Sequence, residues 1–285
     1  MDITYDNNSL TFHGLSHFSL SQCLCCGQAF RWKPHGSGYF GVAMGYAVYA
    51  EQNGQDLTLT GVPESAAADF IRYFDLERDY SAIQASYVND PFLTEGICYA
   101  NGLRVMRQPC FETLISFIIS ANNNVGRISR IIDTICAKYG EPLDGGNDFP
   151  TPQRLASLSP DELKVCGTGY RADYIIGSAK MVCDGFDLDA VADMPYVQAR
   201  EAMTALPGVG LKVADCVALY GMGFLQAFPM DVWMRRVVCG VYHYGGKNDN
   251  MLREFVYTTF GEHAGIAQQY LFHYARHHKE SVCAK

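Results

Sequence analysis

The sequence lacks long apolar runs, low-complexity tracts and a high density of charge. Of its 285 residues, 48% are apolar and 18% are charged, a balance typical of chains that bury a core rather than remain disordered. No stretch approaches the roughly 20 apolar residues that cross a bilayer. The segment Met1–Asn8 has neither the basic nor the apolar region of a secretory signal. We therefore expect an intracellular protein with no membrane partner, in the cytoplasm or nucleoid of a prokaryote or the nucleus of a eukaryote.

The cysteines lack the spacing of a metal site. There are 11 of them, an odd number in a chain expected inside the cell, so disulfides are not expected. The tightest cluster, Cys23, Cys25 and Cys26, does not have the C-x2-C spacing of a zinc site. From residue 206 onward only Cys216, Cys239 and Cys283 occur, too few for a four-cysteine iron–sulfur cluster. We expect no metal and no other cofactor.

Basic residues are outnumbered, which at first argues against a nucleic-acid partner. The net charge is −8, from 22 Lys and Arg and 30 Asp and Glu. Residues 1–99 hold 4 basic and 11 acidic side chains and residues 140–205 hold 5 and 11, whereas residues 100–139 hold 5 and 2 and residues 206–285 hold 8 and 6. A local face governs phosphate binding more than the total charge does. The two positive segments are compatible with nucleic acid, although ordinary variation along a chain would also produce them.

The first hundred residues are predicted to be rich in β-structure. The run Tyr39–Ala50 is mostly aromatic, β-branched and small, and Leu57–Thr60 alternates as a strand does. The Asn53-Gly54 pair between these runs is a strong hairpin signal. A helix is expected to begin within Pro63–Ala66.

Helical patterns dominate from about residue 96. One apolar helix face recurs at Phe111, Leu114, Ile115 and Ile118, and another follows at Val125, Ile128, Ile131, Ile132 and Ile135. The three asparagines between them, at 122–124, mark either a plain helix junction or a polar finger at a site, since asparagine is a poor helix former. We expect an α+β fold: a β-rich antiparallel domain at residues 1–96 and two mostly helical subdomains at 97–205 and 206–285.

The segment Leu206–Asp215 has the pattern of a helix-hairpin-helix, with an apolar residue, then Pro-Gly-x-Gly, then a helix. Gly208 and Gly210 allow a tight turn that a side chain would block. The free backbone N–H groups at the start of the second helix form a natural anion site. A DNA phosphate would fit there without any basic side chain.

Two ionisable residues near the hairpin are candidates for catalysis. Lys212 lies in the first turn of the second helix, where the helix dipole disfavours a positive charge. It is either an exposed surface lysine or an amine nucleophile favoured by burial. Asp231, in the apolar segment Phe228–Trp233, is either a helix N-cap or a carboxylate that stabilises a developing cation. Cys216 lies four residues after Lys212, on the same helix face.

Five blocks in chain order cover most of the sequence: Gly-Gln-Ala-Phe-Arg-Trp at 27–32, the asparagine loop at 122–128, Gly-Tyr-Arg-Ala at 169–172, the hairpin at 206–216, and Ala-Gln-Gln-Tyr-Leu-Phe at 267–272. Together they resemble the 8-oxoguanine DNA glycosylase family of the helix-hairpin-helix glycosylases with a Gly/Pro…Asp signature. The resemblance implies a base-excision repair enzyme with AP (apurinic/apyrimidinic) lyase activity. Its partner would be damaged double-stranded DNA, and we expect a monomer.

The resemblance implies a role for each catalytic candidate. Lys212 would attack C1′ of the damaged nucleotide and form a Schiff base with the opened sugar, permitting β-elimination on the 3′ side. Asp231 would stabilise the cation-like charge of the sugar and help to position the amine.

The resemblance also implies a pocket for the extruded base. The Gly27 carbonyl would accept a hydrogen bond from N7–H of 8-oxoguanine, a proton that guanine lacks. Gln268 would read the Watson–Crick edge, and Cys216 and Phe272 would sandwich the base.

The remaining DNA contacts follow from the same resemblance. Asn122 would fill the hole left by the extruded base, and Tyr170 would wedge into the stack. Arg127 and Arg171 would read the orphaned cytosine, which offers acceptors at O2 and N3. Tyr170 could instead be a residue at the core edge and Arg127 a solvated helix residue. Gly208 and Gly210 complete the DNA-contacting set with Trp233, which stands where animal relatives usually have a histidine.

Other functions remain as alternatives. The C-terminal segment His273-Tyr274-Ala275 lacks the acidic residue expected after Gln268, so the pocket floor differs from the family pattern. Iron–sulfur endonucleases are disfavoured because their four cysteines are missing, and alkyl-base glycosylases because they lack the lysine. A non-catalytic hairpin module that only binds DNA would need neither Lys212 nor Asp231.

Overall fold

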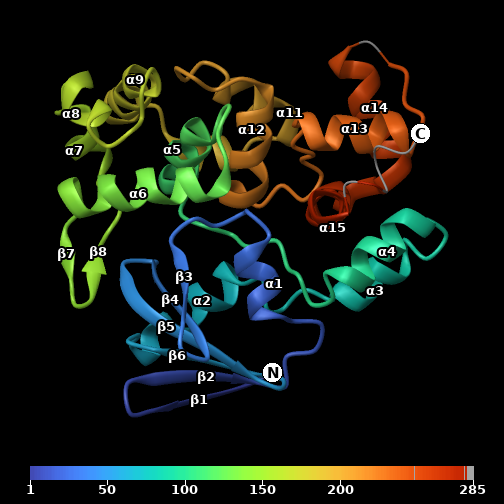
Figure 1. Cartoon of the computed structure of the whole chain (residues 1–285), viewed down its shortest axis with the longest axis horizontal. Coiled ribbons are helices and arrows are strands. Elements are labelled where there is room, and N and C mark those ends of the chain that lie inside the picture. The colour runs from blue at the N-terminus through green and yellow to red at the C-terminus, as the bar shows by residue number, and fades with distance from the viewer. Residues whose placement is uncertain (247, 279, 281–285) are drawn as a thin grey trace.

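An antiparallel sheet forms one end of the molecule and a set of helices forms the other (Figure 1). The computed structural model describes residues 1–246, 248–278 and 280, so Cys283 lies outside the described residues. The expected α+β class with an antiparallel N-terminal sheet is confirmed. Within the described ranges, no helix is long and apolar enough to cross a membrane. Nor do three or more His, Cys, Asp or Glu side chains there gather in a way that could hold a metal.

The sheet has six strands in the order β1-β2-β6-β5-β4-β3, and every neighbouring pair is antiparallel. Leu10 pairs with Leu59 and Phe12 with Leu57, and all four are fully buried. This apolar face packs against helices α1 and α2, which contribute Leu20, Leu24 and Phe70 to the same core. The bounds are β1 (Asp2–Asp6), β2 (Ser9–His13), α1 (Leu20–Cys25), β3 (Trp32–His35), β4 (Gly38–Ala43), β5 (Tyr46–Asn53), β6 (Asp56–Thr60), the 3-10 turn η1 (Glu64–Ala66) and α2 (Ala67–Tyr73).

The β-rich run Tyr39–Ala50 is two strands rather than one. Met44 and Gly45 between them have φ values of 54° and 79°, as the central residues of a two-residue type I′ hairpin turn require. The next hairpin has the predicted turn, since Asn53 pairs with Asp56 around it. The predicted strand Leu57–Thr60 and the helix start near Pro63–Ala66 are confirmed.

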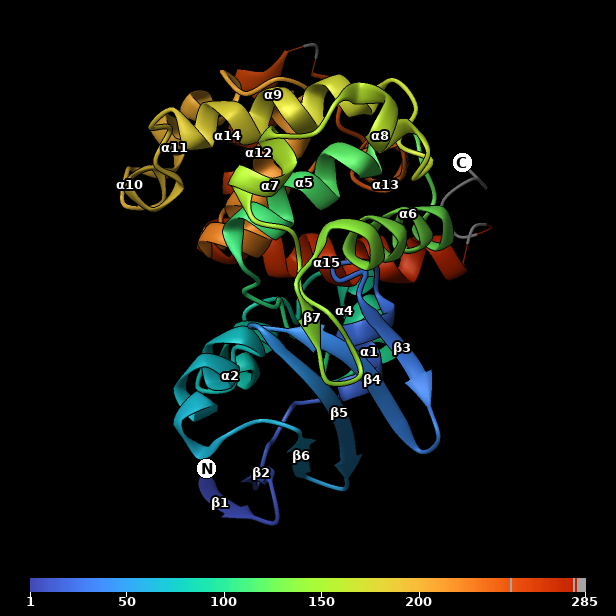
Figure 2. The ribbon, with the colours of Figure 1, turned by 90° about the vertical axis from the view of Figure 1, so that its left-hand side faces the viewer.

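The helices form a second, larger core. Their bounds are α3 (Tyr80–Ala85), α4 (Pro91–Tyr99), α5 (Cys110–Ser120), α6 (Val125–Tyr139), α7 (Pro152–Ala156), α8 (Pro160–Lys164), α9 (Arg171–Cys183), α10 (Leu188–Ala192), α11 (Tyr196–Met203), α12 (Leu211–Val217), the π-helical segment η2 (Ala218–Met222), α13 (Val232–Gly240), α14 (Asp249–Phe260), the 3-10 turn η3 (Gly261–His263) and α15 (Ala264–His277). The predicted apolar faces of α5 and α6 are buried, with Phe111 half-buried at the edge. A short hairpin, β7 (Pro142–Leu143) and β8 (Gly146–Asn147), extends from α6 toward the sheet (Figure 2).

The sheet core and the helical core divide the chain before residue 96, the predicted domain boundary. Leu76 belongs to the sheet core, whereas Tyr80, Ile83 and Leu93 belong to the helical core. Residue 96 lies inside α4. Helices α3 and α4 turn their apolar sides to the helical core. The helical core is also continuous across residues 205 and 206, so the two expected helical subdomains share one core.

Helix α15 lies between the upper helices and the sheet (Figure 2) and contacts α4, α13 and α14. It is tied to both sides by polar contacts. Tyr270 Oη donates to the Leu103 carbonyl at 3.0 Å, and His273 Nε2 lies 2.9 Å from Gln22 Oε1 on α1. The position of α15 is therefore fixed relative to both the sheet domain and the helical layer.

His273 is buried in a way that favours its neutral form. It is 4% exposed, and its Nδ1 atom is buried without a hydrogen-bond partner. Burial lowers the pKa of His273 to about 4, and His277 and Arg276 act in the same direction. An unfolded imidazole has a pKa of about 6.5, so the unfolded chain takes up the proton first as the pH falls.

We predict that the free energy of unfolding is fully present above about pH 6.5 and falls toward pH 4, by at most about 3 kcal/mol from this group. Denaturant titrations across this pH range measure the effect. The His273→Gln variant keeps a donor for Gln22 and should show a flatter pH dependence. His35→Gln, at an exposed site, should match the wild type. Equal slopes in all three proteins would contradict the prediction.

Candidate functional site

The hairpin between α11 and α12 takes the predicted form. Gly208 has φ +78°, and a Cβ there would lie 2.8 Å from Cβ of Tyr174 on α9. Both the backbone conformation and the lack of space therefore require glycine. Gly210 is the N-cap of α12 and supplies no side chain to its first N–H groups. These donors remain available to an anion.

Lys212 is half-buried in the first turn of α12 and points toward α5. Its Nζ atom donates to Ser120 Oγ at 3.2 Å and lies 5.2 Å from the centre of the Phe117 ring. The ion pairs of the described residues include none to Lys212. The plain interpretation as an exposed surface lysine does not fit this position.

Asp231 is the N-cap of α13, and its Oδ1 atom accepts from the backbone N–H of Met234 at 2.8 Å. The structural interpretation of this residue is therefore correct. It does not exclude the catalytic one, because Asp231 also lines the cavity that Lys212 lines. The cap holds one carboxylate oxygen toward the helix and fixes the side chain at the cavity.

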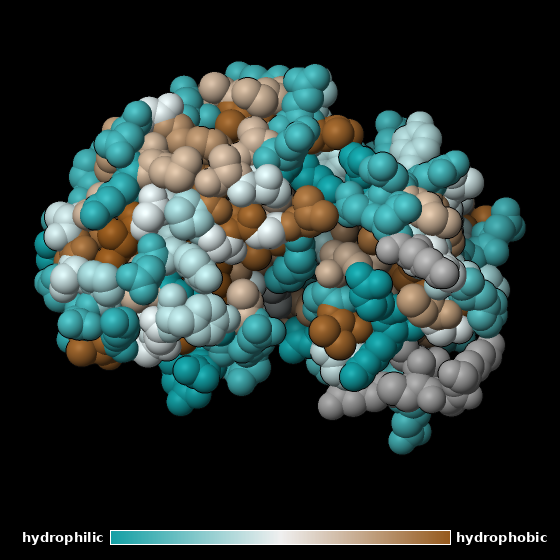
Figure 3. Space-filling view, turned by 90° about the horizontal axis from the view of Figure 1, so that it is seen from above, coloured by the Kyte–Doolittle hydropathy of each residue, from teal (hydrophilic) through white to brown (hydrophobic). Residues whose placement is uncertain are grey.

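This cavity, of about 380 Å³, is built from segments far apart in the sequence. The loop after α1, the end of α5, the start of α6, α12, α13 and α15 all contribute to its wall. Seen from above, the surface of the molecule is hollowed between two lobes, with hydrophilic and hydrophobic side chains side by side along the rim (Figure 3). Among the predicted residues, the cavity wall holds Gly27, Lys212, Cys216, Asp231, Trp233, Gln268 and Phe272.

Two of the predicted base-pocket residues differ in what they could offer a bound base: Gln268 has a free acceptor, and Cys216 has a neutral thiol. Gln268 is 3% exposed; its Nε2 donates to the Pro229 carbonyl at 3.3 Å, while its Oε1 is buried without a partner. Burial raises the pKa of the Cys216 thiol to about 11, with Lys212 acting against the rise. The thiol therefore stays protonated at neutral pH and offers a polarisable packing surface rather than a nucleophile.

A buried hydrogen-bond network fixes the loop that carries Gly27, whose φ is +91°. The Cys26 carbonyl accepts from Gln269 Nε2 at 3.3 Å. On the other side, the fully buried Gln28 side chain donates to the carbonyls of Cys23 and Arg104. The Oε1 atom of Gln28 accepts a hydrogen bond from the backbone N–H of Met106. Both neighbours of Gly27 are thus held, which sets the direction of its carbonyl.

The asparagine loop and the loop at 169–172 meet through Arg171. This residue is 4% exposed; its Nε donates to the Ala121 carbonyl at 3.0 Å and its Nη2 to the Asn122 carbonyl at 3.3 Å. Nη1 donates to the Thr168 carbonyl. The Arg171 guanidinium therefore holds the asparagine loop in this conformation, and its expected role as a base reader stays a prediction. Asn122 itself is exposed, with φ 50°.

The other predicted DNA contacts are at the surface. Tyr170 is 54% exposed, with the Arg171 guanidinium 4.5 Å from its ring centre, so it is not a residue of the core edge. Arg127 is exposed in the first turn of α6, where Asn124 caps the helix. Arg236 lies over the Trp233 ring at 5.0 Å. Of these side chains, Trp233 lies in the cavity wall, and Arg127 and Tyr170 lie outside it.

Two family models divide the chain between them. The N-terminal domain of 8-oxoguanine DNA glycosylase matches residues 12–114, and the HhH-GPD superfamily of base-excision DNA repair proteins matches residues 115–258. The chain belongs to the 8-oxoguanine DNA glycosylase family. It is thus a DNA N-glycosylase with AP lyase activity.

Relatives of this glycosylase match along most of its length. The probable N-glycosylase/DNA lyase of Methanothermobacter thermautotrophicus is 33% identical over 240 residues, 75% of this chain and 77% of the relative. The N-glycosylase/DNA lyase OGG1 of Arabidopsis thaliana is 32% identical, covering 86% and 74%. The crystal structure of the Clostridium acetobutylicum 8-oxoguanine glycosylase/lyase with DNA containing cytosine opposite 8-oxoguanine is 31% identical. It superposes with a TM-score of 0.93 and covers 98% of this chain and 99% of that one.

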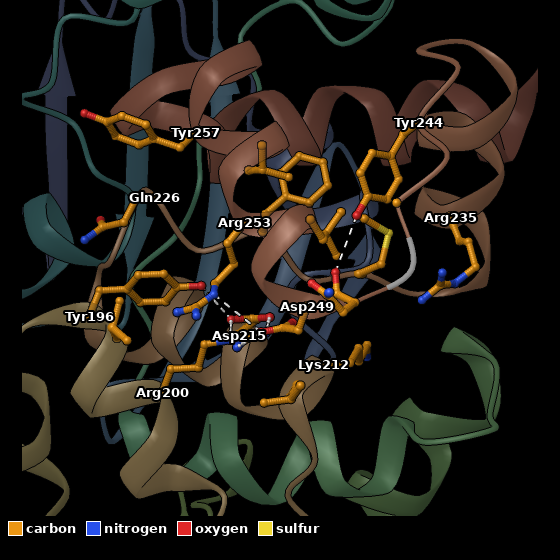
Figure 4. A pocket seen from close by; sticks show the side chains of 18 of the residues that line it. Tyr196, Arg200, Lys212, Asp215, Gln226, Arg235, Tyr244, Asp249, Arg253 and Tyr257 are labelled. Atoms are coloured by element: carbon orange, nitrogen blue, oxygen red, sulfur yellow. Dashed lines mark hydrogen bonds and ion pairs between the residues drawn. The ribbon is translucent and has the colours of Figure 1, made fainter.

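A second cavity of the glycosylase, of about 400 Å³, lies on the other side of Lys212 (Figure 4). Its polar side chains are largely paired with one another. Arg200 forms a two-pronged ion pair with Asp215, at 2.6 and 3.0 Å, and also pairs with Asp249 on α14 at 2.8 Å. Tyr196 Oη donates to Asp215 at 2.7 Å. This cluster fastens α12 to α11 and α14.

Several residues that shape the site were not found from the sequence. Ser120, which accepts from Lys212 Nζ, stands at the end of an apolar helix and directly before the asparagine loop. That position is the one feature of the sequence that could have marked Ser120 as a site residue. Gln28 and Gln269 each adjoin a predicted pocket residue. The Arg200–Asp215 pair joins two helices and leaves no periodic pattern, so nothing in the sequence marks it.

We predict that Arg200→Met lowers the free energy of unfolding by about 3–5 kcal/mol, because Asp215 stays buried without its partner. Burial raises the pKa of Asp215, and Arg200 acts against the rise. Arg253→Met is the control, since Arg253 pairs with Asp249 at 3.4 Å in a more exposed position and should cost at most about 1 kcal/mol. Denaturant unfolding compares the two, and equal losses would contradict a special role for the buried pair.

Proposed function

We propose that this glycosylase excises 8-oxoguanine from duplex DNA, opposite cytosine, and cleaves the strand through a covalent intermediate on Lys212. The observation that carries the proposal is the position of the amine. It lies at the wall of a cavity large enough for a base, beside Asp231 in the same wall, and without an ion-pair partner among the described residues.

The reaction follows from this arrangement. The neutral amine of Lys212 attacks C1′ as the glycosidic bond breaks, and the base leaves with the electron pair. Asp231 stabilises the positive charge that develops on the sugar. The attached nitrogen gives up one proton, and O4′ takes one as the ring opens to the Schiff base. Loss of a C2′ proton then breaks the C3′–O bond.

The proposed choice of 8-oxoguanine as substrate rests on two groups in the cavity wall, the Gly27 carbonyl and the Gln268 side chain. Among the described residues, the Gly27 carbonyl accepts no hydrogen bond, so it can accept one from N7–H, which guanine lacks. The unpartnered Oε1 of Gln268 suits the N1–H and N2–H donors of a guanine-type edge. Cys216 and Phe272 supply two apolar surfaces for the flat base. Adenine has an acceptor at N1 and no amine at C2, so at these two positions it would leave Gln268 Oε1 without a donor, at a cost.

The exposed residues at the cavity entrance suit the DNA left behind. Tyr170 would wedge into the stack and Asn122 would occupy the space of the extruded base. Arg127, exposed and uncommitted, would donate to O2 and N3 of the orphaned cytosine. Arg171 would contribute by holding Asn122 in place. The N–H groups of the hairpin would bind a phosphate, with Trp233 nearby on the DNA-contacting face.

We predict that borohydride traps wild-type protein on duplexes with 8-oxoguanine opposite cytosine and not on duplexes with guanine. Lys212→Gln should form no adduct and lose at least about a thousandfold in excision rate. Lys33→Gln, which removes an exposed lysine of the sheet domain, should behave as the wild type. Base release without an adduct would show that water is the nucleophile. Tight binding with neither product nor adduct would leave only a DNA-binding module.

Asp231 offers a separate test, because asparagine is as good an N-cap as aspartate. We predict that Asp231→Asn keeps the bond to Met234 and the melting temperature but lowers the excision rate by about tenfold to a thousandfold. Asp231→Ala should lose the rate and also about 1 kcal/mol of stability. Single-turnover kinetics with thermal unfolding separates the two effects. Full activity in Asp231→Asn would reduce the residue to a cap.

A further inference from the structure

A guanidinium lies at the wall of the base cavity, one helical turn beyond Phe272. The side chain of Arg276 on α15 lines this cavity, and its Cζ lies 5.2 Å from the centre of the Phe272 ring. Its Nη1 atom is 3.0 Å from the position that a Cβ on Gly27 would take. Arg276 is therefore next to the backbone that would recognise N7–H.

Among the described residues, none accepts a hydrogen bond from Nη1 of this group, which is buried. The three residues before Arg276 include no carboxylate. A buried N–H without an acceptor is costly, and more so on a charged group. A ligand that places an oxygen beside Gly27 would remove that cost.

We propose that Arg276 is a specificity-determining residue that donates from Nη1 to a carbonyl oxygen of the extruded base. The inference rests on the proposed function. When N7–H donates to the Gly27 carbonyl, the exocyclic oxygens O6 and O8 flank N7 on the same edge of the base. Both oxygens are hydrogen-bond acceptors. The donor on Arg276 and the acceptor on Gly27 then read adjacent positions of one edge. Adenine presents neither oxygen and guanine only O6.

A DNA phosphate is the competing acceptor, since arginine binds phosphates well. The burial of Nη1 and its position beside Gly27 favour the base, because a phosphate contact would draw on the exposed part of the guanidinium. The two acceptors predict different losses of DNA-binding affinity when Arg276 is replaced. A base contact affects only duplexes that carry the lesion, whereas a phosphate contact affects undamaged duplexes equally.

The test compares wild type, Arg276→Met, Arg276→Lys and Arg72→Met for binding to 8-oxoguanine·cytosine and undamaged duplexes. Methionine keeps the stem over Phe272 and loses the donors, and Arg72 is an exposed control for the loss of one charge. We expect Arg276→Met to bind the lesion duplex about tenfold to a hundredfold more weakly and the undamaged duplex no more weakly than Arg72→Met does. Arg276→Lys, which keeps the charge without the planar fork, should lie between.

A duplex with 8-oxoadenine, which keeps O8 and replaces O6 with an amine, identifies the oxygen. If O8 is the acceptor, Arg276→Met loses the same factor on both lesions; if O6 is, the loss appears only on 8-oxoguanine. Equal losses on damaged and undamaged DNA, or no loss in a folded Arg276→Met protein, would overturn the proposal. Failure of the wild type to excise 8-oxoguanine would instead overturn the proposed function, independently of Arg276.

Discussion

The packing of α12 is the constraint on which the rest of the site depends. The hairpin glycine Gly208 brings the turn against α9, and the Arg200–Asp215 ion pair fastens the helix to α11 from the other side. With both sides held, the first turn of α12 can direct Lys212 only toward Ser120 and Phe117 on α5. A reactive amine must be placed to within a fraction of an ångström, and a rigid helix start achieves this.

The cavity in front of this amine needs the whole molecule. Gly27 comes from the sheet domain, and Gln268 comes from α15 near the C-terminal end. The contact between Gln269 and the Cys26 carbonyl joins these two distant segments. Because α15 lies between the sheet and the upper helices (Figure 2), this one helix sets the positions of both Gly27 and Gln268 in the cavity wall. The acidic charge of the chain does not disturb this region, since the pocket is lined mainly by neutral groups and by Lys212, Asp231 and Arg276.

The residues differ in how much of their role could be predicted. The glycines of the hairpin and the apolar periodicity of α5 are local properties, so the turn and the helix followed from the sequence. Asp231 is the helix N-cap that one interpretation predicted, and its catalytic role stays a prediction that its place in the cavity wall allows. The predicted boundary at residue 96 lies within α4, because α3 and the start of α4 precede that boundary in the sequence yet pack into the helical core. Arg171 looked like a base reader, yet carbonyls of the asparagine loop occupy its donors.

The sequence by itself determined the hairpin of β5 and β6, the helices α5 and α6, the turn between α11 and α12 and the membership of the family, because these depend on local periodicity, on backbone conformations that only glycine adopts easily, and on short motifs. The tertiary structure decided which side chains remain free. Among the described residues, Gln268 Oε1 and Arg276 Nη1 have no partner, whereas Arg171 and Arg200 each donate to several acceptors. The physical reason is that hydrogen-bond partners of buried groups come from distant segments, and the availability of a donor or acceptor is settled only when those segments meet.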